Sequence, residues 1–276
     1  MKRRVDAYTI SVAVFMLLYS LDLRALGIFS DLVVFAAPYA AALIAFLLAS
    51  ADAERGKVGA RDFTRRLSLS SEGIKITLFA AAPTILLILA VSYLSALLLG
   101  SLGASDIPVP NEPLIPMLVN RALLPSLSEE LLFRFVPLVI IAPYSPRLAL
   151  VLSSVVFAFA HCSFFQIPFA LLAGVIFMAL DLAYESILPS FILHFLNNAA
   201  SVLWIKTGAR ADLAVIFFAV LGTLGIASAI LLTVKRRMLV EALRRSFKAC
   251  ECEYERSLSP LIIIVLGGVS ALVNLF

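Results

Sequence analysis

Residues 76–100 read ITLFAAAPTILLILAVSYLSALLLG and contain no Asp, Glu, Lys or Arg. A helix of about 20 apolar residues is long enough to cross the hydrocarbon core of a bilayer, which is roughly 30 Å thick. Other runs of comparable length also lack these charged residues, and they cover 32–51, 186–205, 213–234 and 257–276. The sequence therefore predicts that the chain crosses a membrane several times as helices.

The composition of the 276-residue chain supports the same conclusion. Hydrophobic residues make up 62% of it and charged residues only 14%, whereas a soluble domain has about 45–50% apolar and about 25% charged residues. This composition excludes a soluble globular enzyme, because so few charges cannot cover a water-facing surface. It also excludes a disordered chain, because the apolar surface is ample for burial. A membrane β-barrel would show short strands of alternating polarity, which the long unbroken runs exclude.

These runs predict an all-α fold, a polytopic transmembrane helical bundle of about 8–9 spans. The expected segments lie near residues 7–27, 31–50, 75–100, 126–143, 148–164, 167–183, 187–205, 212–234 and 258–276. A break is expected near Pro168, because proline removes a backbone donor and disrupts a helix. The stretch Ile107–Pro116, with its four prolines, is expected to be an irregular external loop. We therefore divide the chain into N-terminal helices (1–105), a central segment (115–205) and C-terminal helices (206–276).

The distribution of Lys and Arg predicts the orientation of the chain. If the N-terminus is cytoplasmic, 17 of the 22 Lys and Arg residues fall on the cytoplasmic side, and the opposite loops contain only Lys206 and Arg210. Such an excess marks cytoplasmic loops. We therefore expect a multi-pass protein of the cell membrane with a cytoplasmic N-terminus. The basic stretch Lys235–Lys248 is expected to lie on the membrane surface. The net charge of +4 then reflects topology and membrane lipids, and no nucleic acid partner is expected.

Ionisable residues inside the apolar segments are the candidates for function, because burying them in a membrane is costly. Glu129 and Glu130 begin such a segment, and Arg134 follows Glu130 by four residues. Residues four apart on a helix face each other, so Glu130 is expected to pair with Arg134. Glu129 lies about 100° around the helix and lacks this cation. The alternative is structural, since Ser126 and Glu129 match a capping box at a helix start.

The chain has only two histidines, and both lie inside apolar segments. His161 follows Phe157 by four residues, and His194 precedes Asn198 by four, so each pair shares a helix face. Asn197 could replace Asn198 in a weaker version of this arrangement. The sequence therefore predicts three helices that bring polar groups toward one buried point. Other polar residues, such as Asp181 and Glu185 near a helix end, are expected to reach the membrane interface.

The three ordered motifs resemble those of the type II CAAX prenyl endopeptidases. Their superfamily includes the Abi, or CPBP, proteins and lysostaphin resistance protein A-like members. The resemblance covers residues 115–205, which become the expected catalytic core. It implies an intramembrane endopeptidase of about eight spans. Eukaryotic members cut the last three residues from a prenylated CAAX protein, whereas prokaryotic members vary and include peptide-processing and bacteriocin-immunity proteins. We therefore expect a prenylated or hydrophobic peptide or protein as substrate, and a ninth helix would depart from the family.

The chemistry of amide hydrolysis assigns roles to these residues, since it needs a proton acceptor and a group that stabilises the oxyanion. We expect Glu129, aided by His161, to accept a proton from water. His194 and Asn198 are expected to donate hydrogen bonds to the oxyanion. The alternative within the same superfamily is a non-catalytic membrane protein that acts in bacteriocin immunity or as a scaffold. A proton-coupled transporter ranks last, because no paired inverted repeats are visible.

The remaining site residues are expected to support this chemistry. Glu130 and Arg134 would fix the helix and the orientation of Glu129. Phe157 would line a groove for a prenyl chain, although packing in the core is the stronger interpretation of an aromatic residue here. No cofactor and no metal are expected, because the His-Glu-x-x-His zinc signature is absent. A zinc site stays open as an alternative, since two histidines and two glutamates could provide ligands.

Overall fold

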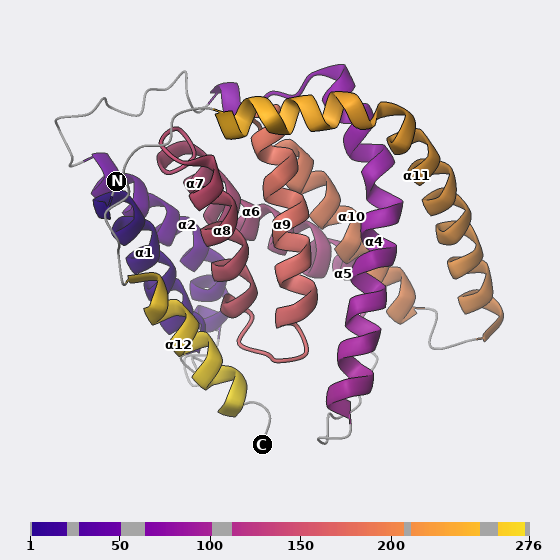
Figure 1. Ribbon diagram of the computed structural model, residues 1–276. Helices are drawn as coiled ribbons and strands as arrows, with labels where there is room; N and C mark the ends of the chain where they lie inside the picture. Colours follow the sequence, from indigo (N-terminus) through magenta and orange to yellow (C-terminus); the bar gives the residue numbers. More distant parts are fainter. Residues whose placement is uncertain are drawn as a thin grey trace.

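The computed structural model describes residues 2–20, 28–50, 64–100, 112–206, 211–248 and 259–273. Within these ranges the secondary structure is helical and includes no strand, so the all-α class is confirmed. The longer helices are α1 (Lys2–Ser20), α2 (Ile28–Ser50), α4 (Ser71–Gly100), α8 (Pro146–Ala160), α9 (Ile167–Tyr184), α10 (Leu188–Lys206), α11 (Ala211–Lys248) and α12 (Ser259–Val273). They pack side by side in a bundle (Figure 1).

Four helical stretches of the described residues are long and apolar enough to cross a membrane. They are Ser71–Leu98, Ile167–Tyr184, Leu188–Lys206 and Val215–Thr233. Shorter apolar stretches cover Ala36–Leu47 and Pro146–Ala160. Large apolar side chains of Val215–Thr233 point outward, and Val215 is 69% exposed. A membrane protein is therefore confirmed, whereas the total of 8–9 spans stays a prediction.

One long, continuous helical rod crosses the bundle next to the predicted site. It consists of α5 (Leu114–Leu118), a π-helical turn (Val119–Leu123), α6 (Leu124–Glu130), a second π-helical turn (Leu131–Phe135) and α7 (Val136–Ile140). The prediction that this segment starts at residue 126 was therefore wrong. Pro116 lies in the first turn of α5, where the backbone N–H has no partner within the helix, so proline is tolerated there.

Each π-helical turn of this rod lies just before a proline inside the rod. Leu124 N–H donates to the carbonyl of Val119, and Val136 N–H donates to the carbonyl of Leu131. The prolines are Pro125 and Pro137, which have no N–H and whose rings crowd the carbonyl four residues earlier. A wider turn at this point relieves the crowding and keeps the rod continuous. The sequence pattern alone gave no sign of these turns.

Helices α8 and α9 form an antiparallel pair that carries His161 at its connection. The N-cap of α8 is Ser145, whose hydroxyl accepts the Leu148 N–H, with Pro146 next to it. The predicted break near Pro168 is confirmed, because α9 starts at Ile167 with a proline in its first turn. The two backbones approach closely at Gly174, where an added Cβ would lie 2.9 Å from the Cα of Ser154.

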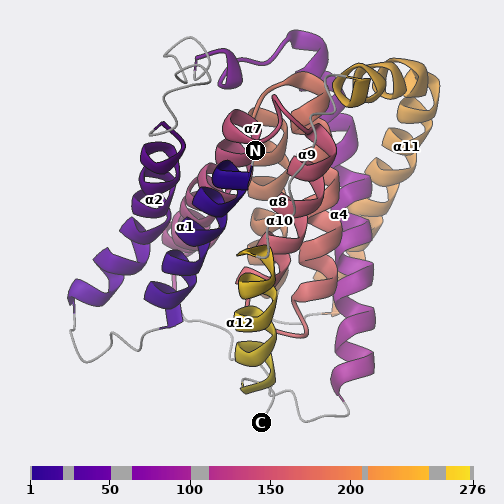
Figure 2. The same cartoon turned by 60° about the vertical axis from the view of Figure 1, so that its left-hand side comes forward.

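Several elements expected to be cytoplasmic meet at one end of the bundle. The N-terminal ends of α1, α4 and α8 lie there, and the last part of α11 bends across this end (Figures 1 and 2). The guanidinium of Arg4 stacks on the ring of Tyr144 at 4.6 Å. This arrangement fits the expected surface position of Lys235–Lys248. Residues 51–63, 207–210 and 249–258, which hold other predicted loop cations, lie outside the described residues, and the orientation itself stays a prediction.

Asp181 corrects one expectation from the sequence. Its side chain is not at the surface of the bundle, because it is 0% exposed. Its Oδ1 accepts the backbone N–H of Ser190 at 2.9 Å, so it satisfies one of the free donors at the start of α10. Glu185, four residues later, is exposed and pairs with Arg65 and with Arg66. Asp181 therefore connects the end of α9 to the first turn of the helix that carries His194.

We expect Asp181→Ala to lower the free energy of unfolding by about 1–3 kcal/mol, because the buried N–H of Ser190 loses its acceptor. Glu185→Ala at the same corner is the matched control, since an exposed ion pair contributes about 0–1 kcal/mol. Thermal unfolding of the full chain in detergent measures both. Equal melting temperatures for the two variants would contradict the connection described for Asp181.

Candidate functional site

Glu130 is the buried centre of the site. Its side chain is 1% exposed, and its Oε1 accepts a hydrogen bond from Nδ1 of His194 on α10 at 2.6 Å. Its Oε2 lies 3.6 Å from Nε of Arg134, one turn later in the rod. The expected pair of Glu130 and Arg134 is therefore confirmed, and His194 adds a second, closer partner that the sequence did not indicate.

Arg134 is fully buried, and α8 supplies much of its surroundings. Its Nη1 donates to the carbonyl of Phe133 at 3.3 Å and lies 3.4 Å from the hydroxyl of Ser153. The Ser153 hydroxyl also donates to the carbonyl of Phe133. Pro137 has no N–H for this carbonyl, so the two side chains replace the donor that a regular helix would provide. The guanidinium also lies 4.3 Å from the ring centre of Phe157, in cation–π geometry.

Glu129 has a different environment from its neighbour. Its side chain is 26% exposed, and its Oε2 lies 3.9 Å from Nε2 of His194. This distance is too long for a direct hydrogen bond, and it suits a bridging water molecule. The imidazole of His194 thus lies between two carboxylates. Nδ1 faces the buried Glu130, and Nε2 faces the more accessible Glu129.

His161 is held by the backbone of its own helix. Its Nδ1 lies 2.8 Å from the carbonyl oxygen of Phe157. A carbonyl oxygen can only accept, so Nδ1 carries the proton and the neutral ring keeps its lone pair on Nε2. The ring also packs edge-on against Phe157, whose ring contacts that of His194 as well. The structure therefore brings both histidines and both glutamates together, as the sequence predicted.

Asn198 reaches the site from α10. Its Nδ2 donates to the hydroxyl of Ser126 at 3.4 Å, and its Oδ1 accepts from Nδ2 of Asn197 at 3.4 Å. Ser126 lies inside the continuous rod, and α6 has no side-chain cap hydrogen bond. The capping-box interpretation of Ser126 and Glu129 was therefore wrong. Ser126 instead orients the amide of Asn198.

Phe157 lies at the centre of the aromatic packing in the site. Its ring contacts those of His161 and His194 edge-on, with centroids 4.8 and 5.8 Å away. The side chain is only 2% exposed, so it packs inside the site and offers little surface to a ligand. Its expected role in substrate binding stays a prediction. The sequence reasoning gave Ser126 only a capping role, and it missed Ser153, next to Arg134, and Phe177, whose ring centre lies 5.7 Å from that of His194. Hydroxyl residues inside apolar helices are a usable signal for the two serines.

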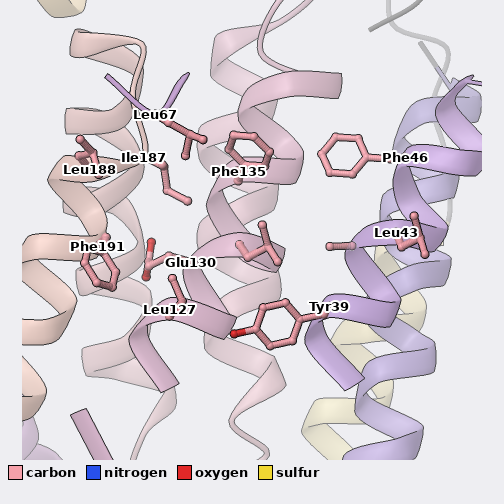
Figure 3. Close-up of a pocket in the computed structure, with 12 residues that line it drawn as sticks. Tyr39, Leu43, Phe46, Leu67, Leu127, Glu130, Phe135, Ile187, Leu188 and Phe191 are labelled. Carbon is pink, nitrogen blue, oxygen red and sulfur yellow. The ribbon is translucent and has the colours of Figure 1, made fainter. Parts of the chain in front are cut away.

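A largely apolar cavity of about 480 Å³ reaches the site at Glu130. Its walls come from α2, from the chain just before α4, from the rod and from the start of α10. The lining residues are Tyr39, Ala42, Leu43, Phe46, Leu67, Leu127, Glu130, Leu131, Phe135, Ile187, Leu188 and Phe191. Figure 3 shows Glu130 beside Leu127 and Phe191, with Tyr39 and Leu43 of α2 on the opposite side. Phe157 does not line this cavity.

The side chains of the site offer few ligands to a metal ion. Among the residues that the structure describes, no group of three or more His, Cys, Asp and Glu side chains could hold a metal ion. Glu130 is engaged by Arg134 and His194, and a nearby guanidinium opposes the binding of a dication. The zinc alternative therefore gains no support from the arrangement of these side chains.

Residues 111–200 match the family model described as type II CAAX prenyl endopeptidase Rce1-like. No curated protein and no solved structure matches the chain. The matched residues include both glutamates, Arg134, both histidines and Asn198. The chain therefore contains an Rce1-like domain, which confirms the family expected from the three motifs.

Proposed function

We propose that this membrane protein is a metal-independent intramembrane endopeptidase. Its substrate is a prenylated, CAAX-type peptide or another membrane-associated peptide, which it cuts near the C-terminus. The observation that carries the proposal is the position of His194 between two carboxylates of unequal exposure. The charge of Glu130 is balanced by Arg134, so we assign this glutamate a structural role. Glu129 is accessible and has no such cation beside it. The Rce1-like domain supports a protease of this type.

The attacking water binds between Glu129 and His194. Nδ1 of His194 donates to Glu130, so the tautomer that carries its proton on Nδ1 has an acceptor at Nε2. A water in the 3.9 Å gap can therefore donate one O–H to Oε2 of Glu129 and the other to Nε2. Both contacts polarise the water, and Glu129 accepts its proton as the oxygen attacks the scissile carbonyl. His161, with a free Nε2, supports Glu129 as a second acceptor.

Asn198 and His194 stabilise the oxyanion. The Asn198 amide has two N–H groups, and Ser126 takes one of them, so the other is free to donate to the oxyanion. Glu129 passes the proton that it takes from water to Nε2 of His194, which then donates to the oxyanion and, as the C–N bond breaks, delivers this proton to the leaving amine. The two flanking carboxylates stabilise the resulting imidazolium. Arg134 pairs with Glu130, and Glu130 in turn fixes the orientation of His194.

The cavity beside Glu130 supports the proposed preference for lipidated or hydrophobic peptides. Its walls are almost entirely apolar, and it borders the site at one carboxylate. Binding pockets of this kind take hydrocarbon groups and leave a few polar groups to orient the ligand. A prenyl chain held there would place the adjoining peptide next to Glu129 and His194.

Glu129→Gln is expected to lower the rate of cleavage by roughly 10²–10⁴, because the amide cannot accept the proton from water. The measurement uses the purified full chain with a fluorogenic farnesylated CAAX peptide. Glu185→Gln, at an exposed position away from the site, is the control and should cleave at the wild-type rate. A chelator such as EDTA or phenanthroline should leave the wild-type rate unchanged.

The results of this experiment test the base, the metal independence and the catalytic activity separately. Wild-type activity with Glu129→Gln would contradict the assignment of the base. Loss of wild-type activity on chelation would overturn metal independence. If the wild type cleaves no prenylated or hydrophobic peptide, the proposal fails and the non-catalytic alternative of the same superfamily is favoured.

Asn198→Ala is expected to lower kcat by about 10²–10³ with little change in KM, because it removes a donor that acts mainly in the transition state. Ser201→Ala on the same helix is the control, since the Ser201 hydroxyl donates only to the carbonyl of Asn197 in its own helix. Near-full turnover by a folded Asn198→Ala protein would show that Asn198 has no oxyanion role.

A further inference from the structure

Helix α12 lies outside residues 111–200, yet it packs next to the site. It contacts α1 and α8, and it runs along their flank in Figure 1. Ile263, Gly267 and Ala271 are spaced four apart and therefore share one face of α12. Ile263 and Ala271 are 0% and 1% exposed, so this face is turned into the bundle. The helix is thus part of the core that surrounds α8.

The contact between α12 and α8 is closest at Gly267. A Cβ added there would lie 2.4 Å from the carbonyl oxygen of Phe159 and 2.8 Å from the Phe159 Cβ. Real Cβ atoms do not approach other atoms this closely, so only glycine fits between the two backbones. Gly268, the next residue, has nothing within 4 Å of an added Cβ. The close approach is therefore specific to one position.

The carbonyl of Phe159 closes the turn that contains His161. It accepts the N–H of Cys162 at 3.1 Å, two residues after the end of α8 at Ala160. Cys162 has a φ of 50°, a left-handed conformation that is unfavourable for a residue with a side chain. Such a backbone persists only where the surrounding structure imposes it. The neighbouring α12 is one of the elements that surround this turn.

We propose that α12 positions His161 through the contact of Gly267 with Phe159. In this account, which rests on the proposed function, the peptidase unit extends past the Rce1-like domain to the C-terminal helix. Gly267 lets α12 lie against the Phe159 carbonyl, which holds the turn of His161 in place. The ring then keeps its Nδ1–H on the Phe157 carbonyl, which leaves Nε2 available as an acceptor. A side chain at residue 267 pushes this turn away and misplaces the ring.

The test compares Gly267→Ala with Gly268→Ala in the full chain. Because the chain has only two histidines, ¹⁵N-histidine labelling gives two imidazoles, and His194→Gln assigns them. The ¹⁵N shifts of a ring report which nitrogen carries the proton. We expect Gly267→Ala to shift or broaden the His161 signals and to lose the Nδ1–H form, whereas Gly268→Ala leaves both rings as in the wild type.

Ile263→Ala is a second test variant, and it introduces no steric clash between α12 and α8. It loosens the same face of α12 by leaving a small cavity, so we expect it to broaden the His161 signals as well. A purely structural role for α12 would lower the melting temperature and leave the His161 signals of the folded protein unchanged in both variants. That result, or equal effects of Gly267→Ala and Gly268→Ala, would overturn the proposal.

Kinetics separate this inference from the proposed function. With the farnesylated peptide, Gly267→Ala should lower kcat by about 10–10² while KM stays within about twofold, as expected for a misplaced catalytic group. Gly268→Ala should cleave at the wild-type rate. If the wild type is inactive but the His161 signals respond as described, the proposed function fails and the positioning by α12 stands. If the enzyme is active and Gly267→Ala leaves kcat unchanged, the positioning fails and the function stands.

Discussion

The buried guanidinium of Arg134 is the constraint on which the site depends. An uncompensated charge inside an apolar bundle would be strongly destabilising, and Arg134 is 0% exposed. Within the rod, Arg134 contacts Glu130 and the carbonyl of Phe133. Helix α8 adds the hydroxyl of Ser153 and the ring of Phe157. Helix α10 contributes His194, which binds the same Glu130. These helices are therefore held to one another by polar contacts as well as by apolar packing.

This constraint explains why two adjacent glutamates differ. Glu130 is committed to Arg134 and to Nδ1 of His194, so its charge serves the structure. Glu129 lies around the helix from it, is partly exposed and faces the other nitrogen of the same ring. Glu130 fixes the orientation of the His194 ring, so Nε2 of this ring is held in place facing Glu129. In the proposed mechanism this fixed geometry places the attacking water.

The sequence predicted those features that follow from regular helical spacing. The pairs Glu130–Arg134 and Phe157–His161 lie on shared faces because residues four apart do so on any helix, and long apolar runs predict helices. Features that depend on three-dimensional contact could not be predicted. The rod continues through Pro125 because a π-helical turn gives the ring room, and Asp181 is buried because α10 begins beside it. The contact of Gly267 with Phe159 joins residues far apart in the chain.

The division of labour between the glutamates is tested most directly by the stability of two neighbouring variants, Glu130→Gln and Glu129→Gln. Breaking a buried ion pair costs about 3–5 kcal/mol, so Glu130→Gln should lower the melting temperature of the detergent-solubilised chain by about 5 °C or more. Glu129→Gln, which breaks no such pair, should leave it unchanged or slightly higher. A loss of stability in Glu129→Gln as large as that in Glu130→Gln would contradict the account.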